Sequence, residues 1–147
     1  MIKVEDMMTR SPHTLLRSHN LTDAKSMMEA LDIRHVPIVD ANKQLLGVVS
    51  QRDVLAAQES SLQNIPENQS YTLETPLYEI MKTGVMTVAP QAGLKESAIY
   101  MQKHKVGCLP VVDKGRLVGI ITNSDFVSIA ISLLELQEEV EPEEMED

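Results

Sequence analysis

Two short signatures in the sequence place a glycine, a hydroxyl and a carboxylate at fixed spacing. Residues 47–53 read GVVSQRD and residues 119–125 read GIITNSD. The hydroxyl belongs to Ser50 or Thr122, and the carboxylate follows three positions later. The apolar pair before each hydroxyl is typical of a strand, so the hydroxyl stands where a strand passes into a helix. At a helix start this spacing predicts a capping box, in which the hydroxyl and the carboxylate accept hydrogen bonds from backbone amides.

The same corner is also suited to a ribose phosphate. Amides at a helix N-terminus bind anions, the hydroxyl can donate to a phosphate or sugar oxygen, and Asp53 or Asp125 can accept from a ribose diol. Gly47 and Gly119 would let the strand turn or let another backbone approach. The spacing alone favours the helix cap. The glycine, the intervening strand and the occurrence of the arrangement twice favour nucleotide binding.

An internal repeat accounts for the duplication. The segment VEDMMTRSPHTL, from Val4, matches LYEIMKTGVMTV, from Leu77, at an offset of 73 residues. RHVPIVD at 34–40 becomes GCLPVVD at 107–113, and after a turn shortened by one residue the offset is 72. We therefore divide the chain into a first repeat at 1–58, a linker at 59–75, a second repeat at 76–132 and an acidic tail at 133–147.

The elements that must position the signatures follow from the local patterns. Asn20 is a plausible N-cap with Asp23 three residues on, and apolar residues follow at helical spacing up to Leu31. Two apolar runs, near residues 36–39 and 45–49, predict a hairpin, and in the second repeat Gly115 is available for a positive φ in the turn. Each repeat is thus β-α-β-β-α. Because a unit of about 60 residues buries little surface alone, the two should share a core.

This order of features resembles the cystathionine-β-synthase (CBS) domain. The matching pattern is an opening M-x-x-x-x-x-T-h segment, a helix, h-P-h-h-D and then G-h-h-[S/T]-x-x-D, where h is apolar. It covers roughly residues 3–57 and 76–130, and two copies in register resemble a CBS pair, or Bateman module. The expected fold is α/β (α+β): two β-α-β-β-α repeats related by pseudo-two-fold symmetry, with small sheets and helices packed around a shared core.

The resemblance implies a set of binding residues in clefts between the repeats. The signature aspartates would contact ribose, the hydroxyls and the residues before the aspartates would lie near ribose or phosphate, the residues before each proline would flank the cleft, and the opening strands would read adenine. Carried onto this sequence, these are Asp53, Asp125, Ser50, Thr122, Arg52, Ser124, Arg34, His35, Val36, Gly107, Cys108, Leu109, His13, Thr14, Met86 and Thr87.

The function that the resemblance implies is regulatory rather than catalytic. The module would bind an adenosine-containing ligand such as AMP, ADP, ATP, S-adenosylmethionine or NAD, require no other cofactor, and signal to an unknown regulated protein. A homodimer, formed face to face into a flat disc, is also implied. The alternative is a structural interaction module that has lost the ligand and fills its clefts with side chains such as Met86, His13 or Tyr100. An enzyme has little support, because no constellation of base, nucleophile and electrophile is visible.

The two prospective sites are unequal in charge. Arg34, His35 and Arg52 surround the first signature, whereas their counterparts in the second repeat are Gly107, Cys108 and Ser124. If a polyphosphate binds, electrostatics favour whichever cleft collects the arginines. The alternative is that both arginines are surface side chains that pair with nearby acids.

Composition excludes several other classes of protein. The net charge of −9 lies mainly in residues 135–147, which hold eight acidic groups and which we expect to be solvated and mostly disordered. With no basic stripe and four aromatic residues, no nucleic-acid partner is expected. No apolar stretch approaches a membrane span and no export signal is visible, so we expect a cytoplasmic protein without a membrane partner. The four histidines lack metal-ligand spacing, and Cys108 is expected to be a buried small hydrophobe.

Overall fold

The computed structural model describes residues 1–62 and 72–140, so most of the expected linker, 59–75, lies outside the described residues. The first repeat contains α1 (Val4–Met7), β1 (Thr9–Arg10), β2 (Leu15–Leu16), α2 (Leu21–Leu31), β3 (His35–Val39), β4 (Leu45–Ser50) and α3 (Gln51–Leu62). The second contains the 3-10 helix η2 (Leu77–Glu79), α4 (Leu94–His104), β5 (Cys108–Asp113), β6 (Arg116–Thr122) and α5 (Asn123–Val140).

The sequence signals predicted at the start of α2 and in the turn between β5 and β6 are present in the structure. At the start of α2, the Asp23 N–H donates to Asn20 Oδ1 at 2.9 Å and the Asn20 N–H donates to Asp23 Oδ2 at 3.0 Å. The predicted capping box is therefore confirmed. In the β5–β6 turn Gly115 has a φ of +83°, as predicted, because only glycine adopts that conformation without a penalty.

Each repeat contributes an antiparallel hairpin to a three-stranded sheet. One sheet has the order β2-β3-β4, and the other has the order β1-β6-β5. β2 runs parallel to β3, with Leu15 opposite Ile38. The equivalent pair in the second repeat, Val88 and Val111, forms an isolated parallel bridge, so the opening strand expected there is reduced to a single pairing. β1 belongs to the first repeat in sequence but pairs with β6 of the second.

The two repeats exchange their opening segments. Residues 8–9 run beside β6, and residues 81–82 run beside β4; we call these the crossing segments. Val48 and Lys82 exchange two backbone hydrogen bonds of 3.0 Å each. A methyl group added at Gly47 would lie 2.6 Å from the carbonyl oxygen of Lys82, and one at Gly119 would lie 3.0 Å from that of Thr9. Both glycines are therefore needed for the close approach of another backbone.

Buried side chains form two clusters, one around each hairpin. The first joins residues of β2, α2, β3, β4 and α3 to Leu77 of η2. The second contains Leu94, Met101, Leu109 and Ile121. The α+β class is confirmed, with small sheets and helices packed on them. The expected shared core takes the form of two clusters, and the first is completed by a residue of the other repeat.

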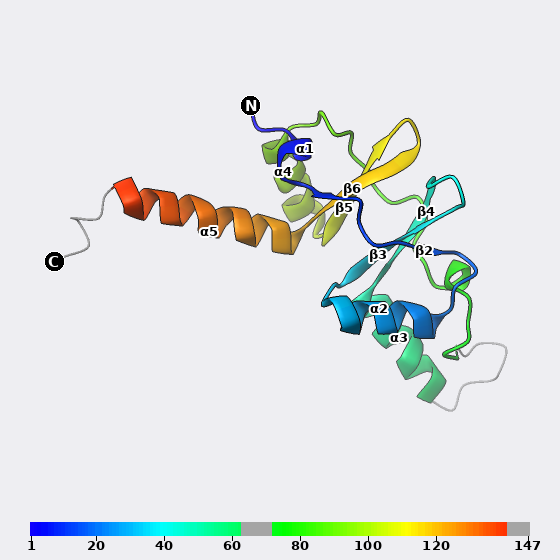
Figure 1. Ribbon diagram of the computed structural model, residues 1–147. Helices are drawn as coiled ribbons and strands as arrows, with labels where there is room; N and C mark the ends of the chain where they lie inside the picture. Colours follow the sequence, from blue (N-terminus) through cyan, green and yellow to red (C-terminus); the bar gives the residue numbers. More distant parts are fainter. Residues whose placement is uncertain (63–71, 141–147) are drawn as a thin grey trace.

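The last helix changes one expectation about the acidic end of the chain. α5 continues to Val140, so residues 135–140 are helical and the expectation of disorder is wrong for them; residues 141–147 lie outside the described residues. Figure 1 shows α5 leaving the rest of the molecule instead of folding back on it. No helix within the described part of the chain is long and apolar enough to cross a membrane.

Candidate functional site: a cleft between the repeats

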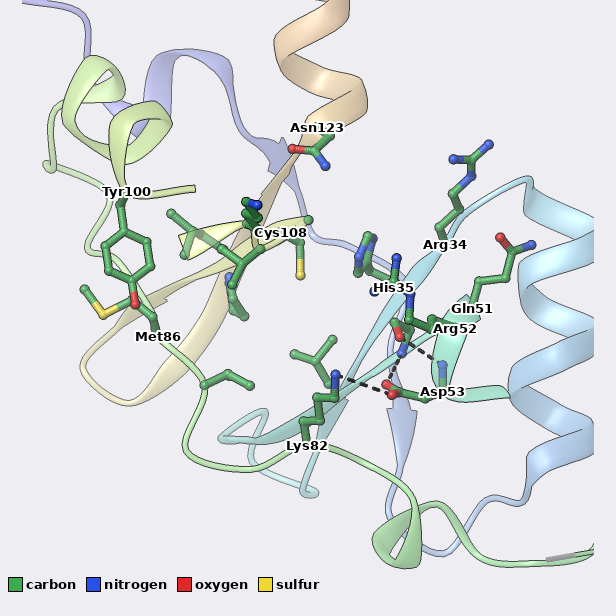
Figure 2. A pocket seen from close by; sticks show the side chains of 18 residues that line it. Arg34, His35, Gln51, Arg52, Asp53, Lys82, Met86, Tyr100, Cys108 and Asn123 are labelled. Carbon is green, nitrogen blue, oxygen red and sulfur yellow. Dashed lines mark hydrogen bonds and ion pairs between the residues drawn. The ribbon is translucent and has the colours of Figure 1, made fainter. Parts of the chain in front are cut away.

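A cleft of about 490 Å³ lies between the two hairpins and receives residues from both repeats (Figure 2). Its volume lies within the range of about 300–1,000 Å³ that is typical of small-ligand sites. In Figure 2 the polar side chains Arg34, Arg52 and Asp53 lie on the side of the first repeat. Met86 and Cys108 lie on the side of the second. A ligand here would contact both repeats at once.

The cleft gathers more than half of the residues that the sequence singled out. Its lining includes Arg34, His35, Ser50, Arg52, Asp53, Met86, Gly107, Cys108 and Leu109. The remaining predicted residues do not line it: His13, Thr14, Val36, Thr87, Thr122, Ser124 and Asp125.

The side chain of Val36 does not line the cleft, because it is fully buried in the first core cluster. Successive side chains of a strand point to opposite faces, and His35, its neighbour in β3, is the residue that faces the cleft.

Both signatures form the predicted capping box. The Ser50 N–H donates to Asp53 Oδ2 at 2.8 Å, and the Asp53 N–H donates to the Ser50 hydroxyl at 3.1 Å. In the second repeat the Thr122 N–H donates to Asp125 Oδ2 at 2.8 Å, and the Asp125 N–H donates to the Thr122 hydroxyl at 3.3 Å. The cap uses one carboxylate oxygen in each case, which leaves Oδ1 available for another partner.

The crossing segments supply that other partner. Lys82 Nζ lies 3.6 Å from Asp53 Oδ1, and the Thr9 hydroxyl donates to Asp125 Oδ1 at 3.2 Å. Lys82 and Thr9 occupy equivalent positions, 73 residues apart. The Lys82 side chain is 69% exposed against 13% for Asp53, so this ion pair is solvent-screened and a ligand could displace it at little cost.

Positive charge dominates the cleft. Arg34, Arg52, Lys82 and Lys105 line it, and Asp53 is the carboxylate among its described lining residues, which leaves a formal surplus of three positive charges. This local surplus contrasts with the net charge of −9 for the whole chain. The cleft is therefore electrostatically suited to an anion.

His35 lies at the centre of this cationic wall. A methyl group added at Gly107 would lie 2.8 Å from His35 Nε2, so the imidazole packs closely against the backbone of the second repeat. Burial lowers the pKa of His35 below its ordinary value; the nearby Asp53 carboxylate opposes this shift and the Arg34 guanidinium adds to it.

Cys108 is half-buried in the opposite wall, where burial raises the pKa of its thiol to about 12. A thiol with that pKa stays protonated at neutral pH and is not a nucleophile. Within residues 1–62 and 72–140 there is also no group of three or more His, Cys, Asp or Glu side chains that could hold a metal ion.

Several cleft residues escaped the sequence analysis. They are Val48, Gln51, Lys82, Val85, Tyr100, Lys105, Val106, Pro110 and Asn123; of these, Tyr100 had been named as a possible cleft filler. Gln51 and Asn123 each directly follow the signature hydroxyl, so the repeat alignment could have identified them. Lys82 reaches Asp53 through the crossing of the repeats, for which the sequence carries no local signal.

Comparison with known proteins agrees with this architecture. The family model of the CBS domain matches residues 4–60 and 77–132. A CBS domain-containing protein of Dictyostelium discoideum is 33% identical and covers 91% of this chain and 94% of its own length. A homoserine O-acetyltransferase of Methanococcus vannielii is 32% identical over 81% of this chain, but the chain spans only 23% of that enzyme.

Solved structures show the same arrangement. A Vibrio cholerae protein provisionally described as an acetoin utilization protein, AcuB, is 77% identical, with a TM-score of 0.85 and coverage of 94% of this chain and 98% of that one. CBSX2 in complex with AMP is 28% identical with a TM-score of 0.78, covering 90% and 98% of the two chains. The CBS pair of protein MJ0100, with 5′-methylthioadenosine and S-adenosylmethionine, is 26% identical with a TM-score of 0.76 and the same coverage.

The duplicated signature, the exchange of opening segments, the cleft between the repeats and both family matches lead to one conclusion. The chain belongs to the CBS domain family and consists of a tandem pair of CBS domains.

Proposed function

We propose that this CBS pair is a regulatory module that binds an adenosine-containing ligand in the cleft and signals to a separate protein. The observation that carries the proposal is the convergence of Asp53 and four cationic side chains on one cleft of about 490 Å³ between the repeats. The AMP and S-adenosylmethionine complexes of similar CBS pairs support the ligand class.

The two walls suit different parts of a nucleotide. Asp53 lines the cleft, and its Oδ1 can accept from a ribose hydroxyl once Lys82 moves aside. Arg34 and Arg52 provide forked donors for phosphate oxygens. The apolar residues Val85 and Leu109 and the ring of Tyr100 offer contact surface for a purine.

The positive charge of the cleft favours some candidate ligands over others. The surplus of three positive charges favours the anions AMP, ADP and ATP over S-adenosylmethionine, whose sulfonium is itself cationic. We therefore propose a phosphate-bearing adenine nucleotide, bound mainly through the arginines that the first repeat contributes.

We propose that ligand binding changes the relative position of the two repeats and that a partner protein recognises this change. A ligand that contacts both walls stabilises the arrangement in which they close on it. We propose a homodimer as the assembled form, and a catalytic role is not part of the proposal. The 77% identity to the Vibrio cholerae protein favours acetoin utilisation as the process in which to seek the regulated partner.

Thermal unfolding and calorimetry against AMP, ADP, ATP, NAD and S-adenosylmethionine test the proposal. A ligand at one hundred times its dissociation constant should add about 2.7 kcal/mol to the stability of the folded chain. Asp53→Asn should weaken binding of the best ligand at least tenfold, because the amide can still cap α3 but loses the charge. Asp125→Asn is the matched control and should change the affinity less than twofold.

The outcome that would overturn the proposal is specific. If no member of the panel shifts unfolding, or if Asp53→Asn binds as tightly as the unmodified chain, the cleft is not a nucleotide site. The alternative of a structural interaction module would then be favoured.

A further inference from the structure

The crossing segments place different side chains beside the two signature carboxylates. Lys82 Nζ lies 3.6 Å from Asp53 Oδ1, whereas the Thr9 hydroxyl donates a neutral hydrogen bond of 3.2 Å to Asp125 Oδ1. Asp53 lines the cleft and Asp125 does not. The carboxylate that can meet a ligand is therefore the one that has a charged partner.

The backbone of Lys82 is fixed, but its amine is free to move. Val48 and Lys82 exchange two backbone hydrogen bonds, and the Lys82 carbonyl oxygen would lie 2.6 Å from a methyl group added at Gly47. The side chain beyond this anchor is 69% exposed and extends toward Asp53 (Figure 2). Because a flexible aliphatic stem joins the anchor to the ammonium, the amine can leave Asp53 and stay beside the cleft.

Lys82 and a ribose compete for the same oxygen. Asp53 Oδ2 already caps α3, so a ribose hydroxyl would bind Oδ1. The displaced amine would then need another anion, and the other charged groups in the described lining are the cations Arg34, Arg52 and Lys105. A neutral nucleoside therefore displaces the amine without replacing its partner. A nucleotide supplies the replacement in its phosphate.

The effect on affinity has opposite signs for the two kinds of ligand. Breaking an exposed ion pair weakens the binding of a nucleoside by no more than about fivefold. A charge-assisted contact between the freed amine and a phosphate strengthens the binding of a nucleotide. One lysine thus disfavours the first ligand and favours the second, which is how a difference in affinity becomes specificity.

We propose that Lys82 is a specificity-determining residue that exchanges Asp53 for the phosphate of the ligand, so that the cleft selects nucleotides over nucleosides. The inference rests on the proposed function, because it concerns the same cleft, and it adds the group that distinguishes the two ligand classes. It also assigns the second repeat a contact with phosphate, in addition to the arginines of the first.

Lys82→Thr tests the exchange, because it copies the equivalent residue Thr9 and removes the competing charge. Calorimetric titration gives the affinity for AMP, and titration of AMP into protein with excess adenosine gives the affinity for adenosine. We expect the variant to bind adenosine about two- to fivefold more tightly and AMP at least about threefold more weakly. The preference for AMP over adenosine should therefore fall at least about sixfold.

Lys105→Thr is the matched control, since it removes another cation from the lining of the same cleft. Within residues 1–62 and 72–140 the ion pair of Asp53 is with Lys82, and Lys105 forms none. The control should therefore weaken the binding of AMP without tightening that of adenosine. An equal gain for adenosine in both variants would mean that the total charge of the cleft, and not the ion pair, sets the preference, and would overturn the proposal.

Amine acetylation followed by mass spectrometry detects the exchange at Lys82 itself. An amine held against a carboxylate reacts slowly, so Lys82 should react about twofold faster in ligand-free Asp53→Asn than in the ligand-free parent chain. Lys105 in the same samples is the internal reference and should not change. In the parent chain, adenosine should increase the reaction rate of Lys82 and AMP should lower it.

Failure of this inference can be told apart from failure of the proposed function. If AMP does not bind the parent chain, the proposed function fails and the role of Lys82 fails with it. If AMP binds but Lys82→Thr keeps the same preference for AMP, the cleft remains a nucleotide site and Lys82 does not select its ligand. Equal acetylation of Lys82 in the parent chain and in Asp53→Asn would refute the ion pair on which the inference depends.

Discussion

The carboxylate of Asp53 has two partners at once. Oδ2 accepts from the Ser50 N–H at the start of α3, and Oδ1 lies 3.6 Å from Lys82 at the edge of the cleft. The capping and ligand-binding interpretations of the signature are therefore compatible, because each uses a different oxygen. A substitution that preserves the cap, such as Asp53→Asn, separates them better than alanine, which removes both.

The protonation of His35 makes the stability of the folded chain depend on pH. Its pKa is lowered chiefly by burial, and the charge of Arg34 contributes in the same direction. A lowered pKa in the folded state means that the unfolded chain takes up the proton first. The stability that neutral His35 contributes is therefore complete above the ordinary value of 6.5 and is lost as the pH falls below it toward the folded-state pKa.

We expect the free energy of unfolding to fall between about pH 7.5 and about pH 5.5, and to fall less in His35→Gln, which cannot titrate. Denaturant unfolding in phosphate-free buffer measures both slopes. Direct titration of the His35 ring by NMR should give a midpoint below 6.5 in the folded chain. A midpoint at or above that value contradicts the assignment.

At the scale of elements, the crossing segments explain the position of the glycines. Residues 81–82 pack on β4 at Gly47, and residues 8–9 pack on β6 at Gly119. A methyl group added at Gly47 would also lie 2.9 Å from the sulfur and 3.0 Å from Cγ of Met81. The same geometry brings Lys82 and Thr9 to the signature carboxylates, so the fold of each site depends on a segment of the other repeat.

Gly47→Ala should lower the free energy of unfolding by about 2–3 kcal/mol, because its methyl group would meet backbone that is already fixed by hydrogen bonds to Val48. Denaturant unfolding measures the change. Gly84→Ala is a useful control: its methyl group would meet no atom within 4 Å, but its φ of +64° is unfavourable for alanine and should cost about 1 kcal/mol. Equal losses in the two variants would mean that the crossing segment yields to the methyl group.

At the scale of the whole molecule, the repeats are no longer equivalent. The first contributes Arg34 and Arg52 to the cleft, whereas the second places Gly107 in the cleft and has Ser124 outside it. Asp125 Oδ1 already accepts a hydrogen bond from Thr9. The two repeats therefore share one backbone fold but contribute different charges to the cleft.

We expect one nucleotide per chain, because the arginines Arg34 and Arg52 line the cleft beside Asp53, whereas Asp125 does not line it and its Oδ1 accepts from Thr9. Calorimetric titration with the tightest ligand of the panel gives the stoichiometry directly. Arg52→Ser, which copies the equivalent residue of the second repeat, should weaken binding about tenfold, since a charge-assisted contact to phosphate contributes about 1.5–3 kcal/mol. Two ligands per chain, or full affinity in Arg52→Ser, would contradict this asymmetry.

The sequence alone determined the features that depend on local spacing. The Asn20 and Ser50 caps, the positive φ at Gly115 and the repeat at an offset of 73 can each be read from neighbouring residues. The same alignment predicted the inequality between Arg34 and Gly107. These predictions succeed because capping, turns and amphipathic periodicity are set within one or two turns of chain.

Tertiary structure decided what depends on distant segments meeting. It brought Lys82 to Asp53 and placed His35 against Gly107. No local pattern could indicate these two contacts, because each depends on which face of one repeat packs on the other. Within single repeats, packing buried Val36 in the first core cluster and carried α5 away from α4. The two signatures predicted two similar strand-to-helix junctions. The crossing of the repeats gave Asp53 a lysine partner, Lys82, and gave Asp125 a hydroxyl partner, Thr9.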